Sequence, residues 1–559
     1  SGATRGVGRV TSERTIMTRN EALFLGGLMV LLWALMPATQ LWDWDEAYYA
    51  RTGIEMFEAG NLLLPQFNGA FFGHKPPFGF WLMGLASQIF GETEFAARFF
   101  SAPALALSAW LTGRTGAMLF GRKAGEAAMI VFATTFLSIY LGAAAMLDAY
   151  LVLGCAIAVW AMVRMLQDRR VSFWLWLWFT FGGLVTLLVK GPVGPVLIGG
   201  LALGVWVFLP ASDRPGWKGF FALAAGGIVA IAGFLLWFLP ANFSTGGNLA
   251  GQVIGIHIIG RALAPMEGHG GQGVLGFLLY LPIYIPVILL GMLPWTAWLP
   301  GAVRHLFRGM ARRERVILLS WFIPLFVAFS LAATKLPHYI FPVFSPMAVA
   351  IGAWLADEKA GKRTFGGLIL SAVFYGVILL ALLWAAMQFT ASTSQMLVML
   401  SVIGFAGMAA LPWLYPVSLR SVPVLALASL AVMQVLYWGG LREIETLAKL
   451  SKPLGIALRQ NAPENAPVFT GEYREPSLSF YASRPVDNPI HEIGTGDFAQ
   501  VLNDNPEGFI VLTMPELKQF TALLDDADVS VLATVSARNF NADGVMQNVY
   551  LLEWSRAGG

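Results

Sequence analysis

Two acidic positions lie just beyond long apolar stretches, Asp45 in the segment Asp-Trp-Asp-Glu of residues 43–46 and Asp148 in the segment Leu-Asp-Ala-Tyr of residues 147–150. Ionisable side chains at the edge of a membrane span are costly and tend to be functional. Because Asp45, its neighbour Glu46 and Asp148 can be placed on the same membrane face, we predict that they form a catalytic site facing one aqueous compartment. The alternative is that Asp45 and Asp148 only cap the helices that follow them.

Two basic corners are stiffened by proline, residues 74–77 (His-Lys-Pro-Pro) and residues 334–339 (Thr-Lys-Leu-Pro-His-Tyr). A further cation, Arg261, lies in a glycine-rich loop. Lys75, Arg261 and Lys335 are candidates for holding a phosphate or pyrophosphate, since ammonium and guanidinium groups pair with phosphate oxygens. The alternative is that each lysine only extends to the membrane interface, as lysines at span ends usually do.

A divalent metal site is the weaker alternative for the same polar residues. Its candidate ligands are His257, His338 and Glu46, with His74 and His269 nearby in the predicted loops. No spacing typical of metal ligands joins them, so hydrogen-bonded or solvated histidines are the favoured interpretation. We therefore expect no required metal and keep zinc or magnesium as the alternative.

The composition is that of a multi-pass membrane protein. Of the 559 residues, 57% are hydrophobic and only 12% are charged, which is too apolar for a soluble fold of this size. The formal net charge of +3 is too small to suggest a nucleic-acid partner. Cys155 is the single cysteine, so the chain has no internal disulfide. Residues 1–16 are interpreted as an extension before a natural start at Met17.

Apolar runs and basic loops predict the topology. Loops rich in lysine and arginine should be cytoplasmic, and they all fall on one side only if the shorter run 77–90 is a juxtamembrane helix. The N-terminus is then inside, and the C-terminus, Asp45, Asp148 and Lys75 are outside. About thirteen runs are long enough to span: 21–40, 96–120, 124–143, 148–166, 173–190, 193–210, 219–240, 276–299, 316–333, 338–355, 366–388, 395–414 and 421–440.

The long apolar runs stop near residue 442, where Glu, Asp, Asn and Pro become frequent. Short β-like runs at 468–470, 509–512 and 529–532 alternate there with helical patterns, which is typical of a small α/β domain. We predict a cytoplasmic N-terminus (1–20), a transmembrane catalytic domain (21–441) with an outer juxtamembrane loop (42–95), and a soluble outer α/β domain (442–559).

The acidic pair after the first span, the His-Lys-Pro-Pro segment, the Leu-Asp-Ala segment and the Thr-Lys-Leu-Pro-His-Tyr corner together resemble the GT-C membrane glycosyltransferases. Within them the chain is similar to the protein-O-mannosyltransferase-like group, which includes the lipid A 4-amino-4-deoxy-L-arabinose transferases. The resemblance covers essentially the whole membrane part. One difference is His74, which stands before Lys75 where enterobacterial aminoarabinose transferases have glutamate, and it leaves the donor sugar open.

This resemblance implies an inverting transfer of 4-amino-4-deoxy-L-arabinose from undecaprenyl phosphate to a lipid A phosphate, at the periplasmic face of the bacterial inner membrane, giving polymyxin resistance. No nucleotide sugar and no cofactor is required. Asp45 would position a substrate or act as a general base toward a hydroxyl acceptor. Lys75, with Arg261 and Lys335, would stabilise charge on the departing phosphate, and His338 and Tyr339 would contact the substrate.

Other functions remain open at this point. A transferase of the same fold could use mannose, galacturonate or arabinose and act on lipopolysaccharide core or on protein. A lipid flippase or transporter would use the same charges to line a path, but the ionisable residues gather on one face and not within the spans. A binding module tethered by the C-terminal tail leaves Asp45, Asp148 and Lys75 unexplained.

Overall fold

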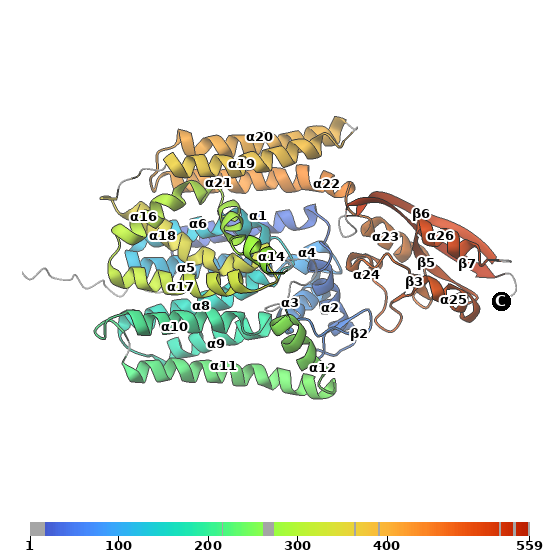
Figure 1. Ribbon diagram of the computed structural model, residues 1–559, viewed down its shortest axis with the longest axis horizontal. Coiled ribbons are helices and arrows are strands. Elements are labelled where there is room, and N and C mark those ends of the chain that lie inside the picture. Colours follow the sequence, from blue (N-terminus) through green and yellow to red (C-terminus); the bar gives the residue numbers. More distant parts are fainter. Residues whose placement is uncertain are drawn as a thin grey trace, which may run out of the picture.

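The computed structural model describes residues 17–214, 216–260, 273–360, 362, 365–389, 392–524, 527–539 and 544–556, so the predicted extension 1–16 lies outside the described residues. Figure 1 shows an elongated molecule, in which long helices run alongside one another in one body and a smaller α/β body continues at one end.

The helical body is built from consecutive helices joined by short connections. Its first half comprises α1 (Arg19–Leu35), η1 (Met36–Ala38), α2 (Glu46–Glu58), α3 (Phe78–Phe90), α4 (Glu94–Arg98), α5 (Ser101–Phe120), α6 (Arg122–Ala133), α7 (Phe136–Gly142), α8 (Asp148–Asp168), α9 (Phe173–Lys190), α10 (Val193–Phe208) and α11 (Trp217–Ser244). Its second half comprises α12 (Asn248–Ala250), η2 (Gly251–Gly260), α14 (Gly273–Tyr280), α15 (Tyr284–Gly291), η3 (Trp295–Trp298), α16 (Leu299–Arg308), α17 (Arg312–Leu331), η4 (Pro337–Val343), α18 (Phe344–Ala356), α19 (Phe365–Ala386), α20 (Ser392–Leu414), α21 (Ser421–Val435), η5 (Leu436–Leu441) and α22 (Arg442–Thr446).

All thirteen predicted runs contain helix, and the protein is a multi-pass membrane protein. Within the described residues, ten helical stretches are long and apolar enough to cross a bilayer, or eleven if α6 and α7, bent by 64°, form one span. The two remaining runs are α10, which is shorter, and α5, which carries Arg114 among serines and threonines. The run 77–90 forms α3, with 13 residues, which suits the predicted juxtamembrane helix.

The first loop, residues 39–100, folds into a small helical layer between the long helices and the α/β body (Figure 1). It holds α2, α3, α4 and a hairpin of β1 (Gln66–Phe67) and β2 (Ala70–Phe71). Close packing of α2 on α3 requires glycine at Gly53, because a Cβ there would lie 2.6 Å from the carbonyl oxygen of Phe80. The hairpin turn places Asn68 and Gly69 at positive φ, as a tight two-residue turn needs.

The α/β body begins at α23 (Ser451–Asn461), a few residues after the predicted boundary at 442, because the last membrane helix continues to Thr446. Its five-stranded mixed sheet has the order β4-β3-β5-β7-β6. The remaining elements are β3 (Val468–Thr470), α24 (Pro476–Ala482), β4 (Ile490–Glu492), η6 (Thr495–Asp497), α25 (Phe498–Asp504), β5 (Glu507–Thr513), α26 (Met514–Thr521), β6 (Ala527–Asn539) and β7 (Val545–Arg556).

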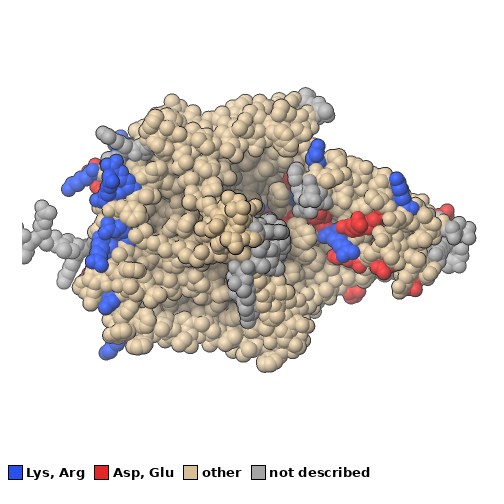
Figure 2. All heavy atoms as spheres, in the orientation of Figure 1, with Lys and Arg blue, Asp and Glu red and all other residues tan. Residues whose placement is uncertain are grey.

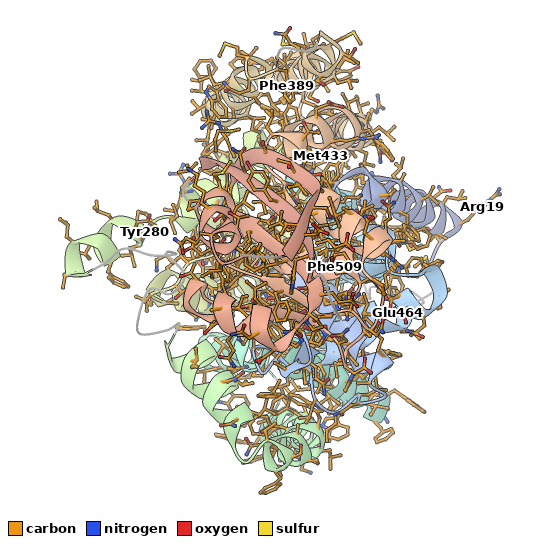
Figure 3. All side chains as sticks on the ribbon, turned by 90° about the vertical axis from the view of Figure 1, so that its right-hand side faces the viewer. Arg19, Tyr280, Phe389, Met433, Glu464 and Phe509 are labelled. Carbon is orange, nitrogen blue, oxygen red and sulfur yellow. The ribbon has the colours of Figure 1, made fainter. Side chains whose placement is uncertain are left out.

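Side-chain alternation along β5 builds two cores on the two faces of this sheet. Phe509 and Val511 pack with residues of α23 and α24, while Ile510 and Leu512 pack with residues of α25 and α26. In the end-on view of Figure 3, Phe509 lies near the centre of the α/β body, in front of the membrane helices. The three predicted β-like runs correspond to β3, β5 and β6.

Charge is divided between the two ends of the molecule. Figure 2 shows lysine and arginine gathered at the end far from the α/β body, and most of the visible acidic side chains on and beside that body. The face between the ends is nearly free of charge in this view, as a lipid-facing belt requires.

Candidate functional site

A buried ion pair joins the second predicted acid to a lysine at the end of another helix. Asp148, the first residue of α8, accepts hydrogen bonds from Lys190 Nζ to both carboxylate oxygens at 2.8 Å. Lys190 is the last residue of α9, which stops because Gly191 follows with a φ of 63°, a conformation that favours glycine. The Asp148 carboxylate is therefore paired with Lys190 and does not cap α8.

The proline-stiffened corner of residues 334–339 lies beside this pair. His338 Nε2 lies 3.8 Å from Asp148 Oδ2, and Lys190 Nζ lies 4.9 Å from the centre of the Tyr339 ring. Both side chains belong to η4, which begins at Pro337. The structure thus gathers a carboxylate, an ammonium, an imidazole and a phenol from three separate elements.

Asp45 occupies the N-cap position of α2, but its side chain makes no capping hydrogen bond. Its Oδ1 instead accepts a hydrogen bond of 2.6 Å from the hydroxyl of Tyr49, one turn further along the helix. The cap interpretation therefore does not account for Asp45. Burial and the neighbouring carboxylate raise the pKa of Tyr49 well above its ordinary range, so Tyr49 stays a hydrogen-bond donor.

The charges around Asp45 favour its ionised form. Burial alone would raise the pKa of Asp45, but His338, the hydrogen bond from Tyr49, Lys190 and Lys75 together lower it below the ordinary value of 3.8. The electrostatic environment of this one carboxylate therefore includes residues of the first loop, of α9 and of η4. Asp45, Asp148, Lys75 and His338 form one electrostatic cluster, and their catalytic role stays a prediction.

Lys75 is half-buried at the entrance to α3, whose N-cap is Pro77. The preceding His74 is exposed and packs against Phe72, with the ring centres 4.2 Å apart. The proline pair thus holds Lys75 close enough to influence Asp45, while His74 contacts aromatic side chains of the first loop.

Glu46 has a structural setting different from that of Asp45. Its carboxylate is fully buried and accepts hydrogen bonds from Arg98 at 2.8 Å and from the backbone N–H groups of Trp42 and Ala145. Arg98 in turn donates to the carbonyl oxygens of Met36, Thr39 and Gln40, which ties the end of α1 to α2. We infer that Glu46 positions Asp45 and does not itself contact a substrate.

The α/β body is attached to the first loop by hydrogen bonds to acidic residues. Asp43 accepts from the backbone N–H of Ser477 at 2.9 Å. Glu94 accepts from Lys452 Nζ at 2.6 Å and from the Tyr481 hydroxyl at 3.0 Å. Since Asp43 lies two residues from Asp45, the α/β body restrains the same loop that carries the site.

The remaining predicted residues either contact other groups or lie outside the described residues. Lys335 Nζ donates to the carbonyl oxygens of Ser330, at 2.8 Å, and Ala332, so its recorded hydrogen-bond partners lie at the end of α17 and not at the carboxylates. Arg261 and His269 lie outside the described residues, and so does the side chain of His257. Among the described residues, no group of three or more His, Cys, Asp or Glu side chains is arranged to hold a metal ion.

Two residues of the site, Lys190 and Arg98, were not predicted from the sequence. Lys190 was counted only as the end of an apolar run, although Lys-Gly-Pro there has the same proline-stiffened cationic pattern as the other corners. Arg98 was the single charge near the start of the run 96–120, and a lone charge in such a place signals a buried partner.

Known proteins resemble this chain in sequence. Residues 74–238 match the family model "Dolichyl-phosphate-mannose-protein mannosyltransferase". The chain is similar to two proteins named undecaprenyl phosphate-alpha-4-amino-4-deoxy-L-arabinose arabinosyl transferase. One is from Edwardsiella ictaluri, with 30% identity over 62% of each chain, and the other is from Aeromonas salmonicida, with 32% identity over 64% of each chain.

The architecture extends further than the sequence match. The crystal structure of ArnT from Cupriavidus metallidurans bound to undecaprenyl phosphate superposes with a TM-score of 0.76 and 20% identity, covering 95% of this chain and 97% of that one. The chain spans less than two thirds of the length of the curated relatives in the sequence match. It has the GT-C fold of the ArnT type, and the resemblance predicted from its sequence is confirmed.

Proposed function

We propose that this chain, which has the GT-C fold of the ArnT type, transfers 4-amino-4-deoxy-L-arabinose from undecaprenyl phosphate to a phosphate of lipid A and so confers polymyxin resistance. The observation that carries the proposal is the cluster of Asp45, Lys75, Asp148, Lys190 and His338 around one point beneath the α/β body. The names of the similar transferases supply the sugar and the carrier lipid.

The proposed chemistry is one displacement at the anomeric carbon. An oxygen of the acceptor phosphate forms the new bond to that carbon, and the bond to the carrier's phosphate oxygen breaks with its electron pair, which inverts the configuration. The leaving group is undecaprenyl phosphate, whose growing negative charge Lys75 is placed to stabilise. The acceptor phosphate is already ionised, so Asp45 orients the substrates and need not remove a proton.

In the proposed site, the Asp148–Lys190 pair holds an ammonium group beside His338 and Tyr339. Lys190 alone would bind phosphate at any position within its reach, whereas the bidentate contact to Asp148 fixes the ammonium in one place. His338 and Tyr339 then border the same space. Arg261, outside the described residues, stays a predicted phosphate ligand.

The proposed location is the bacterial inner membrane, with the site and the α/β body in the periplasm. Its support is the gathering of lysine and arginine at the opposite end of the molecule, which corresponds to the cytoplasmic side. The undecaprenyl carrier and lipid A would both reach the site from the outer leaflet.

We infer that the reaction needs no divalent metal, because Lys75 supplies positive charge that a metal would otherwise provide. Transfer by purified protein should therefore persist in excess EDTA. Loss of transfer that zinc or magnesium restores would overturn this part of the proposal.

Mass spectrometry of lipid A tests the proposed function directly. Cells that express the chain should gain lipid A carrying one added aminopentose, and cells that express Lys75→Met at equal membrane abundance should not. A gain of hexose or of a uronic acid would instead support a related carrier-lipid sugar transferase, an alternative favoured by His74, where the enterobacterial transferases have glutamate. No change in lipid A, core or protein glycosylation would reject the enzyme assignment.

A further inference from the structure

A pocket of about 450 Å³ lies at the end of the molecule far from the α/β body, between the end of α8 and the beginning of α11. It is remote from the proposed catalytic site, because Asp148 lies at the opposite end of α8. Its lining contains three cations and a set of apolar side chains: Met162, Met165, Arg169, Arg170, Val171, Trp217, Lys218 and Leu223, with Gly216 and Gly219.

The backbone at the end of α8 sets two arginines side by side at this pocket. Arg169 ends the helix with φ 49° and ψ 27°, a left-handed conformation that glycine adopts far more readily than arginine. The N–H of Arg170 returns to the carbonyl oxygen of Met165 at 3.3 Å, which closes the turn. A strained conformation at a non-glycine residue often marks a functional position.

Positive charge at the pocket exceeds negative charge. Arg169 Nη2 lies 3.9 Å from Asp213 Oδ1, and the Arg169 side chain is 74% exposed, so this contact is weak. Arg170 and Lys218 are exposed, and within the described part of the chain neither takes part in a recorded ion pair. Figure 2 shows the excess of lysine and arginine at this end of the molecule.

The apolar lining of the pocket favours a phospholipid over a free anion as its ligand. Met162, Met165 and Leu223 come from the membrane helices and form an apolar wall beneath the charges. Trp217 is 64% exposed, at the place where a tryptophan suits the membrane interface. A small anion would use the cations alone, whereas a phospholipid would also cover the exposed ring of Trp217.

We propose that this pocket binds the phosphate headgroup of an anionic phospholipid, with Arg170 and Lys218 pairing with the phosphate and the exposed Trp217 ring contacting the upper acyl chains. Basic pockets between membrane helices are suited to such headgroups. The alternative is that these residues only follow the general excess of positive charge on cytoplasmic loops. A matched variant at the same end of the molecule separates the two explanations.

The test uses the full-length protein, stripped of lipid in a neutral detergent. Phosphatidylglycerol should raise the thermal midpoint of the wild type, and phosphatidylcholine should not. The double variant Arg170→Gln/Lys218→Gln should bind phosphatidylglycerol about thirtyfold more weakly, since each cation near a membrane surface contributes a factor of about five. The control Arg122→Gln/Lys123→Gln removes the same charge from exposed residues outside the pocket and should bind normally.

Three further outcomes decide the proposal. Equal weakening in both double variants would overturn it in favour of general surface charge. Stabilisation by inorganic phosphate alone, to the same extent as by phosphatidylglycerol, would replace the lipid with a free anion and also overturn it. Native mass spectrometry should find one tightly retained anionic phospholipid on the wild type, with lower occupancy in Arg170→Gln/Lys218→Gln.

Discussion

Lys190 and Asp148 are 42 residues apart in sequence, yet the ammonium of one bonds to both carboxylate oxygens of the other at 2.8 Å. The contact joins the last residue of α9 to the first residue of α8, so two antiparallel helices present opposite charges at the same level. His338 and Tyr339 lie beside this pair, so the pair connects η4 to the beginning of α8 and the end of α9.

Lys190→Met should leave the Asp148 carboxylate buried without its partner, which costs about 3–5 kcal/mol of stability in buried pairs. The double variant Asp148→Asn/Lys190→Met should regain much of the thermal midpoint but none of the transfer activity. Thermal unfolding and a transfer assay on the two single variants and the double variant measure this. Full activity in the double variant would reduce the pair to a structural role.

Much of this site could be predicted because its residues lie at loop–helix junctions, where apolar runs stop abruptly. Asp45, Lys75, Asp148 and His338 each mark such a junction, and the topology from the basic loops put them on one face. The α/β domain was predictable from its alternating runs, which the two cores of β5 explain.

What the sequence could not supply is the choice of partner across long separations. Asp45 and Glu46 are adjacent acids at the start of one helix, but α2 turns one toward Tyr49 and Lys190 and the other toward Arg98. Lys335 looked equivalent to Lys75, yet its ammonium bonds to the end of α17. Such differences arise from packing and not from local pattern.

Lys75→Met should abolish transfer with little change in the thermal midpoint, because the side chain is half-buried at the entrance of α3 and the proline pair keeps the backbone in place. Lys75→Arg should retain part of the activity, since the charge stays while the point geometry is lost. Kinetics with a lipid-linked sugar donor check both. Normal turnover by the methionine variant would show Lys75 to be only an interfacial lysine.

The proposed orientation can be measured with single cysteines. Ala59→Cys, in the first loop, should react with an impermeant thiol reagent in intact spheroplasts, whereas Lys123→Cys, at the opposite end, should react only after lysis. Both positions are exposed, and neither needs the positive φ of the neighbouring Gly60 and Gly121. The native Cys155 is buried, so the wild type serves as the unlabelled control. The reverse labelling pattern would invert the topology.

Glu46→Gln should lower stability far more than Asp45→Asn. Arg98 and two backbone N–H groups all bond to the Glu46 carboxylate, so the change leaves the buried Arg98 charge without its counter-ion, at a cost of about 3–5 kcal/mol. Circular dichroism melts of the two variants compare the effects. Equal midpoints would contradict the positional role assigned to Glu46.

Asp45→Asn keeps the shape of the side chain and the acceptor for Tyr49, so the protein should fold while transfer falls severely. If Asp45 removes a proton from a hydroxyl acceptor, the rate should drop at least about a hundredfold. If it orients an aminosugar, the loss should appear mainly in donor affinity and depend on the charge of the sugar. The pKa of Asp45 lies below its ordinary value of 3.8, so the carboxylate is ionised throughout pH 5–8. The stability that the ionised carboxylate contributes is fully present above the ordinary pKa and is lost only as the pH falls through the lowered pKa. The wild-type pH–rate profile should therefore show no limb from Asp45 between pH 5 and 8. Near-normal turnover by both Asp45→Asn and Asp148→Asn would remove the carboxylates from the mechanism altogether.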